Sequence, residues 1–128
     1  MANLPSMTPY LIRAFYEWSV DNDFTPQLSV LAEPEDYRVI VPSNYVTNNE
    51  IVLNISPTAC DSLQLGNDVI TFKARFAGKV ESISIPVDRV KAIFIREEGY
   101  GMRFDVDPMK KPKMSGDQPK RGFVKVED

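Results

Sequence analysis

Histidine is absent from this 128-residue sequence, and cysteine occurs once. Without histidine, Ser-His-Asp and Cys-His catalytic groups are excluded, together with the commonest protein ligand of zinc. Carboxylate, lysine and tyrosine chemistry stays possible. The single Cys60 cannot form an internal disulfide, so we expect a small core side chain in a reducing compartment, the cytoplasm. No pattern indicates a metal ion, a cofactor or a catalytic residue.

Long hydrophobic runs are also absent. No apolar stretch approaches the roughly 18–20 residues that a membrane span needs. Residues 1–8 lack a basic stretch followed by an apolar one, which predicts that there is no signal peptide. The length and the 43% hydrophobic content are ordinary for one globular domain. We therefore expect a single cytoplasmic domain that does not contact a membrane.

Charge is unevenly distributed along the chain. Residues 1–107 carry 9 Lys+Arg and 15 Asp+Glu, whereas residues 108–128 carry 6 and 3, within an overall net charge of −3. The acidic body makes nucleic acid an unlikely partner of the whole chain. The change of sign divides the sequence into a domain over residues 1–107 and a basic tail with a separate role.

The tail has two parts. Residues 108–120 contain three prolines, a glycine and four lysines, a composition typical of a flexible linker. In residues 121–128 apolar side chains return beside a lysine, as Phe123, Val124, Lys125 and Val126. Apolar residues at the end of such a tail are either accidental or a docking peptide.

The first structured element is predicted to be a helix from Pro9 to Asn22 or Phe24, with Thr8 as its N-cap and Pro26 preventing continuation. The helix has two apolar stripes, although a surface helix needs only one. The stripes are Leu11, Ala14, Phe15 and Trp18, and Ile12, Tyr16 and Val20. Either the helix is deeply buried, or one stripe covers the domain and the other contacts a second subunit. We favour the second interpretation.

Short segments of period-two hydrophobicity follow, separated by turn residues, and they predict strands. The predicted strands are residues 28–31, 37–41, 51–55, 69–76, 82–86, 90–96 and 102–106, with residues 57–66 as a connection. Short strands joined by tight turns indicate a small barrel or a bent sheet. The predicted fold is mainly β with an N-terminal α-helix.

Six pieces of the sequence, in order, resemble the stringent starvation protein B (SspB) family over about residues 9–107. They are Pro9–Trp18 with the following Asp-Asn and Phe-Thr-Pro, Ile51–Ile55, Leu63–Asp68, Phe72–Gly78, Ile85–Val87 with Ala92–Gly99, and Gly101–Phe104. The resemblance implies a small, strongly bent SH3/Sm-like β-barrel and a homodimer built through the helix. We assign Ile12, Tyr16 and Val20 to that dimer interface.

The resemblance also implies a function. The family binds the ssrA degradation tag as an extended peptide in a surface groove, and delivers tagged proteins to the ClpX unfoldase of ClpXP. Such binding uses backbone hydrogen bonds at a sheet margin and pockets for alternate side chains. The implied peptide-binding residues are Tyr45, Ala59, Lys73, Ala74, Arg75 and Phe76. The implied ClpX-docking peptide is Phe123–Val126, although here two acidic residues follow it.

Other interpretations stay open from the residues alone. Phe72 and Phe76 suit a core as well as a groove, and Arg75 could be a solvated strand residue. Tyr45 could cap one end of a barrel. An RNA-binding Sm-like module is the alternative function, because the tail is basic. A carboxylate enzyme would need two acids, for example from Glu97-Glu98, to converge in a cleft, and we expect no enzyme.

Overall fold

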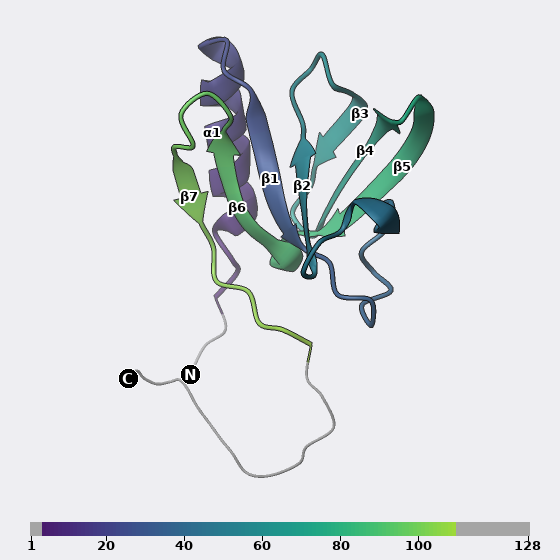
Figure 1. The fold of residues 1–128 in the computed structure, drawn as a ribbon. Helices are drawn as coiled ribbons and strands as arrows, with labels where there is room; N and C mark the ends of the chain where they lie inside the picture. The colour runs from purple at the N-terminus through teal and green to yellow at the C-terminus, as the bar shows by residue number, and fades with distance from the viewer. Residues whose placement is uncertain (1–3, 110–128) are drawn as a thin grey trace.

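Residues 4–109 are described by the computed structural model (Figure 1). The elements in chain order are α1 (Thr8–Asp21), β1 (Pro26–Leu31), η1 (Ser43–Tyr45), β2 (Glu50–Asn54), β3 (Cys60–Leu65), β4 (Val69–Phe76), β5 (Lys79–Pro86), η2 (Val87–Arg89), β6 (Val90–Ile95) and β7 (Gly101–Arg103). The predicted class, mainly β with one N-terminal helix, is confirmed.

The strands form two antiparallel sheets. One has the order β2-β1-β6-β7 and the other the order β3-β4-β5. Figure 1 shows the two sheets side by side at an angle, with α1 along β1 and β6. Strand pairing among the described residues therefore gives two sheets, and it does not by itself close the predicted barrel.

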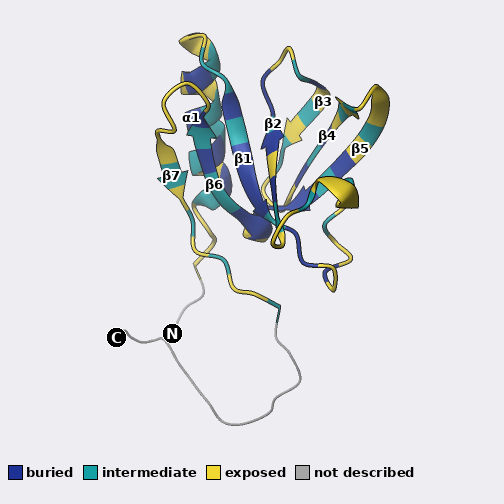
Figure 2. Ribbon diagram, viewed as in Figure 1, coloured by how far each residue is buried: buried dark blue, intermediate teal, exposed yellow. Residues whose placement is uncertain are grey.

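Both sheets and the helix share one hydrophobic core. Its members alternate along the strands, as period-two patterns require. Figure 2 shows the buried residues gathered where α1 and the two sheets face one another. The largest fully buried apolar side chains are Ile12, Leu28, Val30, Leu53, Ile55, Ile70, Ile85, Val90 and Ile93.

The helix stripe that we assigned to a subunit interface packs against the core of the domain itself. Ile12 is only 1% exposed and packs inside the domain, so its assignment to a dimer interface is corrected. Tyr16 is partly buried against the same core, and Val20 is half-buried. The most exposed apolar residues of the helix are Tyr10 and Trp18. These two aromatic side chains mark a second, exposed face of the helix.

The ends of α1 differ slightly from the prediction. Thr8 is the first helical residue rather than the N-cap, which is Met7 without a side-chain cap. The Ser6 side chain caps the first turn instead, because its Oγ accepts a hydrogen bond from the Thr8 N–H at 3.1 Å. After Asp21 the chain turns through Asp23, whose φ of 61° is incompatible with a continued helix.

Two predictions of secondary structure are wrong, one of a strand and one of a connection. Residues 37–41 are not a strand, since only Ile40 pairs, in an isolated bridge with Ser84. Residues 57–66 are not merely a connection, since they contain β3. The polar pattern of β3 hid it: Asp61, Ser62 and Gln64 are exposed, and Ser62 has a φ of 58° where the pairing with β4 shifts register.

Candidate functional site

Four of the six predicted peptide-binding residues line one surface cavity of about 280 Å³. Ala59 comes from the turn before β3, and Lys73, Ala74 and Arg75 come from β4. We call this feature the strand-edge cavity. The remaining lining residues are Thr58, Cys60, Asp61 and Val80.

The cavity lies where β3 stops covering the edge of β4. The β3–β4 ladder ends at the pair Cys60–Ala74, whereas β4 pairs with β5 as far as Phe76. Phe76 and Lys79 flank the two-residue turn Ala77-Gly78, whose positive φ angles are those of a type I′ hairpin. These flanking residues exchange the last hairpin hydrogen bonds, so the backbone N–H and C=O of Arg75 point to the uncovered side.

The turn beside this edge holds Ala59 in place. The N–H groups of Ala59 and Cys60 both donate to the Ser56 carbonyl, at 3.0 and 3.2 Å. The Ser56 N–H in turn donates to Asn54 Oδ1 at 2.9 Å. Because the Ala59 N–H is used in this turn, it does not donate to the Arg75 carbonyl. The small Ala59 side chain leaves room for another chain along the edge.

The other two predicted residues contact each other. The rings of Tyr45 and Phe76 lie 5.0 Å apart with an interplanar angle of 60°. Tyr45 is 43% exposed on η1, and Phe76 packs partly against the core. Phe76 directly follows Arg75 in β4, but neither aromatic ring lines the strand-edge cavity. Phe72, by contrast, is 3% exposed and belongs to the core.

Positive charge dominates the rim of the strand-edge cavity. Lys73 and Arg75 are exposed there, against one carboxylate, Asp61. The Arg75 guanidinium contacts the Gly78 carbonyl at 3.4 Å, the long limit of a hydrogen bond. Most of its donors are therefore directed to solvent and can meet an acidic or amide-bearing ligand.

The thiol at the cavity is not a nucleophile. Burial, with a smaller contribution from Asp61, raises the pKa of Cys60. Its Sγ contacts the Ser56 carbonyl at 3.5 Å. A thiol kept protonated in this way is unreactive at neutral pH, because the thiolate is the attacking species. Cys60 shapes the wall of the cavity rather than its chemistry.

Of the carboxylates considered for catalysis, Glu97 has a structural part. Glu97 accepts hydrogen bonds from the Thr25 N–H at 2.9 Å and Oγ1 at 2.7 Å, and these bonds hold the pKa of Glu97 below its usual value. This pairing fastens the β6–β7 turn to the start of β1. Among residues 4–109, no group of three or more Cys, Asp and Glu side chains is placed to hold a metal ion. No helix of that region is long and apolar enough to cross a membrane.

Sequence reasoning missed four other residues at the cavity: Thr58, Cys60, Asp61 and Val80. A signal existed for Val80, because the Ala77-Gly78 turn fixes the hairpin register and places Val80 opposite Arg75. No equivalent signal existed for Asp61, since β3 itself was not recognised.

An open strand edge beside a shallow, positively rimmed cavity is typical of small domains that bind extended polypeptides. The chain belongs to the stringent starvation protein B family, whose model matches residues 6–125. It is 47% identical over 97 residues to the stringent starvation protein B homolog of Haemophilus influenzae. That match covers 76% of this chain and 63% of the relative, so it spans less than two thirds of the relative's length.

Proposed function

We propose that this protein is an adaptor that binds ssrA-type degradation tags and delivers tagged proteins to the ClpX unfoldase of ClpXP in the cytoplasm. The observation that carries the proposal is the strand-edge cavity. The uncovered backbone of Arg75 lies beside Ala59 there, in a member of the stringent starvation protein B family.

The geometry suggests how a tag would bind. An extended peptide would pair with the Arg75 N–H and C=O as a short extra strand. One peptide side chain would enter the cavity between Ala59 and Ala74. The next would face the ring pair of Tyr45 and Phe76. Arg75 would then donate charge-assisted hydrogen bonds to a polar tag residue.

Binding without chemistry fits the groups at the site. Cys60 is a protonated thiol, and Glu97 is occupied by Thr25. We therefore propose that the protein is not an enzyme and needs no cofactor. We also propose that the two sheets are halves of a strongly bent SH3/Sm-like barrel, since they enclose a single core.

We further propose a homodimer through the outer face of α1. Trp18 is 41% exposed and Tyr100 is 65% exposed, and their rings lie 6.2 Å apart. Tyr10 lies two turns before Trp18 on the same helix and is 57% exposed. Such a group of exposed aromatic residues suits a subunit interface. Tyr16 and Val20, at the border of this face, would be covered only in part.

Delivery would use the tail. Residues 110–128, with Phe123–Val126, lie outside the described residues, and their docking on ClpX stays a prediction. Tethering by such a segment raises the concentration of a bound client near the unfoldase without any new contact to the tag. In a dimer, two tails would add avidity.

The first test is titration of a fluorescent ssrA-tag peptide into the purified protein, followed by anisotropy. Saturable binding that is lost in an Ala59→Leu variant, which fills the strand-edge cavity, is the expected result. Val52→Leu, a surface change on β2 away from the cavity, is the matched control. Absence of binding by the wild-type protein would refute the proposal. A single-stranded RNA titration at low and high salt then tests the alternative, an RNA-binding module.

A further inference from the structure

A second hollow, distinct from the strand-edge cavity, lies between the loop after β1 and the turn before β2. Its volume is about 600 Å³. Apolar side chains form much of its wall: Ala32, Val39, Ile40, Val41 and Val46. We call it the loop groove. Tyr37 and Ile40 at the groove are 90% and 55% exposed, so large apolar surfaces stand uncovered.

The loop groove has a firm frame. Ile40 exchanges two backbone hydrogen bonds with Ser84 of β5, at 2.8 and 3.0 Å. On the opposite wall the Ala32 N–H donates to the Asn49 carbonyl at 2.7 Å. Because Ile40 faces β5, the backbone N–H and C=O of Val41 point the other way. Within residues 4–109 these two Val41 groups have no hydrogen-bond partner. The groove thus offers the two backbone groups of Val41 as well as an apolar surface.

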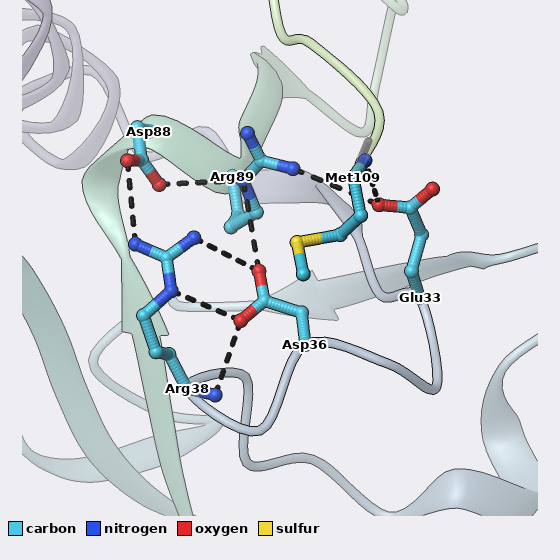
Figure 3. Close-up of polar contacts among 6 residues, drawn as sticks. All are labelled: Glu33, Asp36, Arg38, Asp88, Arg89 and Met109. Atoms are coloured by element: carbon cyan, nitrogen blue, oxygen red, sulfur yellow. Dashed lines mark hydrogen bonds and ion pairs between the residues drawn. The ribbon is translucent and has the colours of Figure 1, made fainter. Parts of the chain in front are cut away.

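The chain leaves the domain at the wall of this groove. The Met109 N–H donates to Glu33 Oε1 at 2.8 Å, and Glu33 lines the loop groove (Figure 3). Glu33 is held in turn by buried Arg89, whose Nη1 lies 3.8 Å from the same oxygen. Asp36 and Arg38 continue this ion-pair network along the loop. The described part of the chain therefore ends beside the groove.

The charge and sequence of residues 110–128 match the groove. Residues 110–128 carry 6 Lys+Arg and 3 Asp+Glu. The polar cluster beside the groove has three carboxylates, Glu33, Asp36 and Asp88, against two guanidinium groups, Arg38 and Arg89 (Figure 3). The tail also contains the apolar residues Phe123, Val124 and Val126, which suit exposed backbone groups flanked by apolar side chains.

We propose that Phe123–Val126 of the same chain occupies the loop groove, pairing with Val41 and covering Ile40 and Tyr37. Thirteen residues, 110–122, lie between Met109 and Phe123, and a flexible chain of that length spans about 20 Å on average. The segment can therefore return to a groove whose wall it has just left. This intramolecular docking is independent of tag binding. If the tail is also the ClpX-docking peptide, as proposed above, the bound form withholds it.

The test is backbone NMR relaxation on the full-length protein. Residues 123–126 are expected to show order parameters of about 0.8, like the folded domain, rather than below about 0.6 as in a free tail. In Ile40→Lys the order of these residues is expected to fall to the free-tail range. Val52→Lys is the control, because Val52 is similarly exposed, at 49%, receives the same charge and does not line the groove.

Three outcomes overturn the inference. Residues 123–126 could be as mobile as a free tail in the wild-type protein. They could be ordered but unaffected by Ile40→Lys, which would place the tail elsewhere. Their order could also disappear on dilution, which would mean docking between two copies. Tag-peptide titration of Ile40→Lys is run in parallel. An Ile40→Lys variant with a released tail and unchanged affinity for the tag peptide supports the inference. This titration separates tail docking from the proposed tag binding.

Discussion

Replacing Arg75 by alanine tests the proposed tag site most directly. The Arg75 side chain is exposed at the strand-edge cavity, and its one recorded contact, with the Gly78 carbonyl, is 3.4 Å long. The substitution should therefore change the free energy of unfolding by no more than about 0.5 kcal/mol. Tag binding would lose a hydrogen bond to a charged group, worth about 1.5–3 kcal/mol. The dissociation constant should rise by about 10- to 150-fold.

The assay is anisotropy of a labelled tag peptide, with urea unfolding as the check on stability. Arg75→Lys is expected to be intermediate, because it keeps the charge but loses the planar donor pair. Arg103→Ala is the control, since Arg103 is also an exposed strand arginine but belongs to the other sheet. An Arg75→Ala affinity within about threefold of the wild type, under 1 kcal/mol, would refute this account of the site.

Three further predictions concern stability, assembly and the thiol. Asp36→Asn is expected to lower the free energy of unfolding by about 3 kcal/mol in urea titrations at neutral pH, because buried Arg89 loses a partner. Hydrogen bonding to Arg38 lowers the pKa of Asp36, so wild-type stability should fall as pH drops below 3.8, and the variant should lack this part of the decline. Trp18→Asp should convert a dimer to monomers in sedimentation experiments, whereas Val52→Asp should not; a monomeric wild type would contradict the interface. Cys60 should react with a thiol reagent far more slowly than free cysteine until urea unfolds the chain, and a fast native reaction would show that the thiol is accessible.

The sequence predicted best where one face of a strand is buried. The segment 69–76 was assigned with its correct bounds, because Ile70 and Phe72 alternate with solvated residues and Gly78 supplies the turn. The helix was also predicted to within a residue at its start. The side of the helix that faces the core was not predicted. α1 has two apolar faces, and hydrophobic periodicity does not distinguish which of them is buried. In the structure Ser19 lies on the inward face of the helix. It is fully buried, and its Oγ donates to the Phe15 carbonyl.

The errors have a common physical origin in pairing between distant residues. Residues 37–41 have strand-like composition, but the turn at Asp36 and Arg38 leaves only Ile40 in register with Ser84. β3 looks like a loop, yet β4 supplies its hydrogen-bond partners despite the irregularity near Ser62. In both cases the partner strand decides the conformation, and no local pattern contains that information.

The candidate site was predictable only as a set of residues, and that set came from family resemblance. Lys73, Ala74 and Arg75 would be found from any correct assignment of β4. Their proximity to Ala59 depends on where β3 begins, and the sequence did not indicate that position. The contact between Tyr45 and Phe76 likewise depends on the placement of η1. The prediction for Phe123–Val126 falls outside the described residues.

The uncovered edge of β4 is very short, and this limits how long a bound chain can stay. β3 covers β4 up to Ala74, and the turn follows directly after Phe76, so Arg75 is the one residue of β4 on this edge between the end of the β3 pairing and the hairpin end. One residue of pairing and a cavity of about 280 Å³ hold few ligand atoms. Affinity differences arise mostly from dissociation rates, so a small contact surface implies rapid release. For the proposed adaptor, rapid dissociation would allow a tagged protein to be transferred under a small pulling force. The adaptor would then be free to bind another tagged protein.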